Sequence, residues 1–294
     1  MSPSRPWDPD ARIVFPSSDG AGIPGALFHP DAGLDRQCAV VLSTATGAPQ
    51  RFYFPFARDL ADAGFAVLTY DFRGMGWARP ARMRGFDATF THWANDAEGA
   101  LAHARQRWPS HRLMTVGHSI GGLMPMLADG VVHVERMVTV GTQTAYWRDW
   151  PLKVRYPMFF LWHVLVPLVT SVAGYFPASR LNLGEDLPKG LAQAWARRWR
   201  LEMFDGFPKN PGDRIRRVRA KVLALAPTDD TFGSPAALRR LHDQLSAPVT
   251  YRFLDPREHG YRSIGHFGYF HLRHQALWAQ SKEWLGGEAG PVGE

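Results

Sequence analysis

Short apolar runs alternate with helix-like segments along most of this 294-residue sequence. The run Ala39–Leu42 has four consecutive apolar residues, as in a strand that is buried on both faces. Between Phe90 and Trp108, by contrast, apolar residues recur at helical spacing. The alternation predicts an α/β fold with a mostly parallel central sheet and flanking helices. Further strands are expected at 13–15 and 26–28 (an early hairpin), 66–70, 113–116, 137–140, 222–226 and 249–253.

The alternation stops between residues 145 and 210. This segment is rich in aromatic residues and proline, with helical patterns but no strand-like run. We therefore expect a core formed by residues 1–144 and 211–294, with residues 145–210 inserted as a helical cap. Trp195 and Trp199 are expected to be core contacts. The aromatic residues expected to form an apolar ceiling over a pocket are Trp147, Trp150, Phe159, Phe160, Trp162, Tyr175 and Phe176.

Composition restricts the compartment and the partners. Cys38 is the only cysteine, which excludes an intrachain disulfide, and we expect it to be buried and inert. The N-terminus lacks an apolar signal segment, so we expect a cytoplasmic protein. The net charge is +7, but the basic residues are scattered and form no nucleic-acid-binding motif, so no nucleic-acid partner is expected.

One stretch, Pro157 to Phe176, is apolar enough to suggest a membrane. Its length approaches the roughly 20 residues of a transmembrane helix. However, Pro167 and Gly174 interrupt it, and Arg155 and Arg180 flank both sides equally. We therefore expect a cap over a site and no membrane contact, with a membrane-attached protein as an alternative.

Residues 116–123 combine a strand end, a sharp turn and a helix start. Gly117, Ser119 and Gly121 have the G-x-S-x-G spacing of a nucleophile elbow. Side chains at the two flanking positions would clash in so tight a turn, and glycine avoids this. The helix N-terminus would face developing negative charge. The pattern predicts Ser119 as a nucleophile, whereas the neighbouring His118 is expected to be structural.

Several motifs occur in an order that resembles the α/β-hydrolase superfamily, and within it a group of predicted bacterial serine hydrolases with a helical cap. The resemblance spans nearly the whole chain. The matching residues are Ala45–Gln50, Tyr70–Gly76, Gly117–Gly122, Thr228–Asp230 and Ile264–Gly268.

The resemblance implies a catalytic acid and a histidine after the serine. Asp230, in the loop after the strand at 222–226, is favoured as the acid over Asp229. His266, before the last helix, is favoured over His259. In the serine–histidine–acid template, His266 takes the proton from Ser119 and Asp230 orients the imidazole.

The resemblance also implies an oxyanion hole made of backbone N–H groups. Ile120, directly after the nucleophile, is expected to supply one donor. The second is expected from Thr46, or otherwise from Gly47. Many relatives carry His-Gly at this turn, where this chain has Thr44 and Ala45, so the second donor is less defined.

We expect a serine hydrolase that cleaves a small to medium apolar carboxylic ester or thioester through an acyl-enzyme. An aminopeptidase-like hydrolase is one alternative, with Glu185 or Asp186 binding the substrate amine. A catalytically silent ligand-binding protein of the same fold is another. No cofactor or metal is expected, because His271 and His274 lack a nearby acidic or cysteine partner and are expected on a helix surface.

Overall fold

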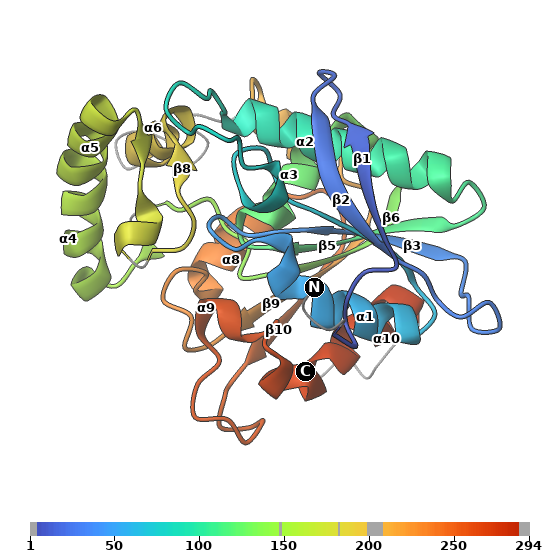
Figure 1. The fold of residues 1–294 in the computed structure, drawn as a ribbon. Coiled ribbons are helices and arrows are strands. Elements are labelled where there is room, and N and C mark those ends of the chain that lie inside the picture. Colours follow the sequence, from blue (N-terminus) through green and yellow to red (C-terminus); the bar gives the residue numbers. More distant parts are fainter. Residues whose placement is uncertain (1–4, 147–148, 182, 199–207, 288–294) are drawn as a thin grey trace.

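The computed structural model describes residues 5–146, 149–181, 183–198 and 208–287. Trp147 and Trp199, two of the aromatic residues considered above, lie outside the described residues. A twisted eight-stranded sheet crosses the molecule, with helices on both of its faces (Figure 1). The strand order is β1-β2-β4-β3-β5-β6-β9-β10.

The sheet is antiparallel at one edge and parallel elsewhere. Its first two strands form the expected hairpin, and β2 also runs antiparallel to β4. Every residue of β3 and β4 is buried, which explains their uninterrupted apolar sequences. The strands are β1 Ala11–Pro16, β2 Gly22–Phe28, β3 Cys38–Ser43, β4 Ala66–Tyr70, β5 Arg112–His118, β6 Val134–Val140, β9 Lys221–Pro227 and β10 Val249–Leu254.

Alternating side chains of β3 divide the core into two layers. Ala39 and Val41 pack in the layer that includes residues of α2 and α3, whereas Val40 and Leu42 pack with residues of α1 and α10. The apolar face predicted for the segment from Phe90 to Trp108 is buried against the first layer. The helices of the two layers are α2 Phe90–Arg107, α3 Ile120–Leu127, α1 Phe54–Asp62 and α10 Ala279–Gly286, and α8 Pro235–His242 adds Leu241 to the first.

The segment after β6 is mainly helical. One continuous helical stretch runs from Leu152 to Ala173, and Figure 1 shows it to one side of the sheet. The expectation of no strand between residues 145 and 210 was wrong, because β7 and β8 form a short antiparallel ladder. Each has only two residues, too few to produce a periodic pattern. The elements are α4 Leu152–Phe160, η5 Leu161–Leu165, α5 Val166–Ala173, β7 Tyr175–Phe176, η6 Ala178–Leu181, β8 Leu187–Pro188 and α6 Lys189–Arg198.

The connections place several loops at the carboxyl edge of the parallel strands. The turn after β3, the turn after β5 and the loop after β9 all begin there, as is usual for ligand sites in open α/β sheets.

The division into a core and a cap at residues 145 and 210 remains a prediction. The remaining short helices are η1 Gln50–Tyr53, η2 Gly76–Ala78, η3 Asp129–His133, α7 Pro211–Ile215, α9 Gly265–Gly268 and η7 Leu272–Trp278.

Candidate active site

Ser119 lies in the turn between β5 and α3. Its backbone has φ 53° and ψ −124°, a strained conformation for a residue with a side chain. The flanking glycines are needed for close approach: a Cβ on Gly117 would lie 2.3 Å from Cα of Gly122, and one on Gly121 would lie 2.4 Å from the carbonyl oxygen of Ser43. The sequence 116–123 therefore forms a sharp turn that presents the Ser119 side chain at the carboxyl edge of the sheet.

Two backbone N–H groups near Ser119 have no hydrogen-bond acceptor among the described residues. Ile120 is the first residue of α3, so its N–H has no intrahelical acceptor. In the turn after β3, Ala45 N donates to Tyr53 Oη at 3.0 Å and Gly47 N donates to Met75 Sδ at 3.3 Å. Within the described residues, Thr46 N has no acceptor, and the buried Thr46 Oγ1 also has no partner.

His266 and Asp230 form a hydrogen-bonded pair. Nδ1 of His266 lies 2.7 Å from Oδ2 of Asp230, whose side chain is fully buried. The other oxygen, Oδ1, accepts hydrogen bonds from the N–H groups of Phe232 and Gly233, both at 2.8 Å. A proton on Nδ1 leaves Nε2 of a neutral ring free to accept a proton. The pair therefore has the arrangement of an acid that orients a base.

Asp229 has a different position from its neighbour. Its two carboxylate oxygens accept hydrogen bonds from the backbone N–H groups of Ile264 and Gly265, at 3.0 and 2.9 Å. Asp229 therefore holds the loop that carries His266 and does not contact the imidazole through a hydrogen bond. The rival histidine, His259, is exposed on a turn after β10.

His118 connects the two loops of the site. Its Nε2 donates to the carbonyl oxygen of His266 at 2.8 Å, so its Nδ1 accepts from Tyr53 Oη at 2.7 Å. Complete burial, together with the nearby His266, holds the pKa of His118 well below its usual range, so its ring is neutral. Sequence reasoning treated His118 as structural and missed Tyr53, because no short motif marks a tyrosine that is distant in the chain.

A cavity of about 340 Å³ opens beside Ser119. Apolar side chains form most of its wall, and within the described residues no carboxylate lines it. The lining includes Thr46, Ser119, Gln143, Trp150, Met158, Leu161, Trp162, Phe176, Leu187, Trp195, Phe232, His266 and Phe267.

The structure corrects part of the expected aromatic ceiling. Phe159 and Phe160 are exposed on the opposite side of the helix, because their neighbours at Met158 and Leu161 occupy the inner face. Tyr175 does not line the cavity. Trp195, in contrast, packs in the core and also lines the cavity. Three of the expected aromatic residues lie in the cavity wall: Trp150, Trp162 and Phe176.

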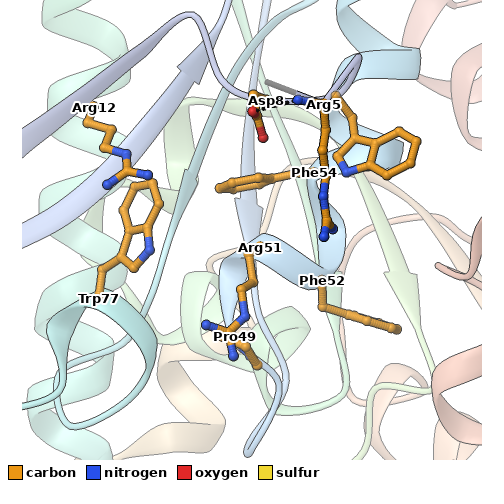
Figure 2. A pocket seen from close by; sticks show the side chains of 9 residues that line it. Arg5, Asp8, Arg12, Pro49, Arg51, Phe52, Phe54 and Trp77 are labelled. Atoms are coloured by element: carbon orange, nitrogen blue, oxygen red, sulfur yellow. Dashed lines mark hydrogen bonds between the residues drawn. The ribbon is translucent and has the colours of Figure 1, made fainter. Parts of the chain in front are cut away.

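A second cavity, of about 750 Å³, lies near the N-terminus and does not include Ser119. Figure 2 shows its arginine and aromatic side chains, with the Arg12 guanidinium 4.3 Å from the ring centre of Trp77. Arg5, Arg12 and Arg51 are exposed, so their charges remain in contact with solvent. This surface hollow has none of the reactive groups found beside Ser119.

The residues considered for other chemistry have structural contacts. His274 is buried and donates from Nδ1 to the carbonyl oxygen of Gly268 at 2.7 Å, so the expectation of a surface position was wrong. The spacing of His271 and His274 could not reveal this, because the backbone is irregular at His274, which turns inward while His271 stays exposed. Within the described residues, no group of three or more His, Cys, Asp or Glu side chains could hold a metal ion.

Glu185 and Asp186 are also engaged. Oε2 of Glu185 accepts from Gly76 N at 2.6 Å, and Asp186 binds Arg79 at 2.7 Å and Ser179 at 2.5 Å. Neither carboxylate lines the cavity beside Ser119.

The sheet topology and the elbow at Ser119 define an α/β-hydrolase fold, and a family-model match supports its place in the α/β-hydrolase superfamily. The fold predicted from the sequence is thereby confirmed. A family model described as "Serine aminopeptidase, S33" matches residues 36–181. No curated protein matches the sequence significantly.

Solved structures similar to this chain include several lipases and esterases. A soluble variant of monoglyceride lipase from Saccharomyces cerevisiae has a TM-score of 0.66 at 14% identity, covering 98% of this chain and 100% of that one. Monoacylglycerol lipase from Paleococcus ferrophilus has a TM-score of 0.59 at 16% identity, covering 91% and 99%. The esterase domain of a Rhodothermus marinus protein has a TM-score of 0.56 at 16% identity, covering 94% and 99%. At these identities the likeness describes the fold alone.

Proposed function

We propose that the protein is a serine hydrolase that cleaves a small to medium apolar carboxylic ester or thioester through an acyl-enzyme on Ser119. One observation carries the proposal: His266, which is hydrogen-bonded to the buried Asp230, lines the same apolar cavity as a serine in a strained elbow. A silent ligand-binding protein would not need this pair beside that serine.

The proposed reaction begins when His266 Nε2 removes the proton from Ser119 Oγ as the oxygen attacks the substrate carbonyl carbon. The tetrahedral intermediate then expels the alcohol or thiol, which takes the proton from the His266 imidazolium. Water, deprotonated by the same nitrogen, attacks the acyl carbon, and the carboxylic acid leaves as Ser119 regains its proton. Asp230 holds the imidazole orientation and stabilises the imidazolium throughout.

The backbone N–H groups of Ile120 and Thr46 are the proposed oxyanion donors. Their lack of acceptors in the described part of the chain supports this role, because a donor that is already hydrogen-bonded is not available to the substrate. Gly47 is disfavoured because its N–H is bonded to Met75 Sδ. Each such donor contributes about 10²- to 10³-fold in rate in related chemistry.

The apolar wall supports an apolar acyl group as the substrate portion beside Ser119. Two of the similar structures are monoacylglycerol or monoglyceride lipases, which is consistent with an ester substrate. The aminopeptidase alternative lacks support, since Glu185 and Asp186 have partners elsewhere and no carboxylate of the described residues reaches the cavity.

Hydrolysis of a panel of 4-nitrophenyl esters, matched thioesters and aminoacyl amides tests this function. We expect turnover of esters or thioesters with a preferred acyl length, and its loss in Ser119→Ala. Ser171→Ala, which changes an exposed serine on α5, is the matched control and should retain full activity. Turnover only of aminoacyl amides would support the aminopeptidase alternative, and no turnover of any class would oppose the enzyme proposal.

A further inference from the structure

The helical stretch Leu152–Ala173 exposes an unusually apolar surface. Seven large apolar side chains on it are between 45% and 70% exposed. Soluble proteins rarely present so many contiguous apolar side chains to water, and such patches mark interaction sites. We call this surface the outer face, and its residues are Leu152, Tyr156, Phe159, Phe160, Val164, Leu168 and Val172.

The opposite side of the same helix is attached to the protein. Met158, Leu161 and Trp162 line the cavity beside Ser119, and Val166 and Thr170 are fully buried. The helix is therefore apolar on both sides, which is unusual for a helix with one face in water. Packing within the protein explains the inner face but leaves the outer face unexplained.

The charged residues within the segment that carries the outer face are all positive. Residues 150–184 contain no aspartate or glutamate, and their cations are Lys153, Arg155 and Arg180. Arg84, from outside the segment, donates to the carbonyl oxygens of Val172 and Ala173 at the end of the helix. An apolar helix face with a basic border fits an anionic lipid surface, where side chains enter the acyl region and cations meet the headgroups.

We propose that the outer face docks the protein on an anionic lipid surface, with the helix lying in the plane of the interface. The stretch has 22 residues, which is long enough to cross a bilayer. Crossing would require the buried side chains of Val166 and Thr170 to leave the protein, whereas docking leaves them in place. The sequence alone favoured a cap without membrane contact, and the exposure of Phe159 and Phe160 is what changes this view.

The proposal has a geometric consequence for the cavity. The helix that meets the lipid with its outer face lines the Ser119 cavity with its inner face. Docking therefore brings that cavity within one helix thickness of the interface, where apolar molecules concentrate. The docking step itself does not depend on the chemistry proposed for Ser119.

Flotation with lipid vesicles tests the docking. We expect the full-length protein to float with vesicles of phosphatidylcholine mixed with phosphatidylglycerol, less with phosphatidylcholine alone, and less again at high salt. Phe160→Glu and Leu168→Glu should each weaken binding about tenfold or more, because each removes from the outer face one large apolar side chain that docking would bury in the lipid. Val14→Glu, which changes an equally exposed residue on β1, is the matched control and should bind as the wild type does.

Three results would overturn the docking proposal. The first is wild-type protein that stays unbound with both vesicle types. The second is equal loss of binding in Val14→Glu and Leu168→Glu. The third is a wild-type protein that does not bind vesicles and is a dimer by light scattering, while Leu168→Glu is a monomer. That result would identify the outer face as a contact between two copies of the chain. Ester hydrolysis in free solution should persist in Leu168→Glu, which separates failure of docking from failure of the proposed enzyme function.

Discussion

Nε2 of His118 donates a hydrogen bond to the carbonyl oxygen of His266 at 2.8 Å. The same imidazole accepts from Tyr53 Oη, which in turn accepts from the N–H of Ala45. One buried chain of hydrogen bonds thus joins the turn that carries Thr46, the elbow that carries Ser119 and the loop that carries His266. These three segments are far apart in sequence, so their relative positions depend on such contacts.

His118→Ala should reduce kcat about 10- to 100-fold, because the His266 carbonyl and Tyr53 lose buried partners worth about 1–3 kcal/mol. KM should change little, since neither His118 nor Tyr53 lines the cavity. Steady-state kinetics, with the melting temperature measured in parallel, check this. Tyr53→Phe should lose less, because the bond from His118 to His266 remains. A rise in KM at unchanged kcat would contradict a positioning role.

Asp230→Asn should lower kcat by about 10⁴-fold, the scale seen when the histidine loses its correct tautomer. Asp229→Asn keeps one oxygen for the backbone N–H groups of Ile264 and Gly265 and should cost far less activity. Its main effect should be a stability loss of about 1–3 kcal/mol from the weakened loop contact. Single-turnover and denaturation measurements on both variants distinguish the two carboxylates. Equal losses of kcat would contradict the assignment of Asp230 as the acid.

The sequence predicted most of the sheet because buried parallel strands are uninterrupted apolar runs, as in β3 and β4. The elbow could be predicted for a similar reason, since the spacing of Gly117, Ser119 and Gly121 reflects local crowding. The choice between Asp229 and Asp230 depends on which carboxylate points toward His266. Local sequence does not encode that direction for Asp229, because its carboxylate is held by backbone N–H groups from a loop more than thirty residues away, whereas Asp230 is held by N–H groups of its own turn.

The segment between residues 145 and 210 shows a different limit. Composition identified an aromatic segment, but it did not distinguish the side of the helix that meets the cavity from the side that meets solvent. Phe160 and Leu161 are neighbours in sequence and face opposite environments. The irregular turn at η5 shifts the helical phase, so simple periodicity does not assign the faces.

Trp162→Ala should enlarge the cavity and move the preferred acyl chain to a longer length. The indole lies in the wall on η5, so its removal adds space without touching Ser119. Short esters should lose kcat/KM, since each missing apolar contact costs roughly 1–3 kcal/mol. The acyl-length panel measures this directly. Phe159→Ala, on the exposed side of the same helix, is the control and should leave the preferred length unchanged.

The stability of the fold should fall between pH 7 and pH 5, partly because of His242. Burial lowers the pKa of this histidine in the folded state to about 4. In the unfolded chain the histidine binds a proton as the pH falls through about 6.5, whereas in the folded state it stays neutral until the pH is much lower. The resulting loss is about 2 kcal/mol for this residue over that range. His242→Gln should be less stable at pH 7 but should show a shallower dependence on pH in urea unfolding. If the free energy of unfolding of His242→Gln fell with pH as steeply as that of the wild type, the result would contradict a neutral, buried His242.

Reaction of the folded protein with a fluorophosphonate, followed by intact mass and peptide mass analysis, tests the central claim about Ser119 most directly. The proposed mechanism predicts one adduct per chain, located on Ser119, and labelling that slows by orders of magnitude in His266→Ala. Unfolded protein should not react. A folded protein that remains unlabelled at Ser119, or labelling that is equally fast without His266, would contradict the assignment of Ser119 as the activated nucleophile.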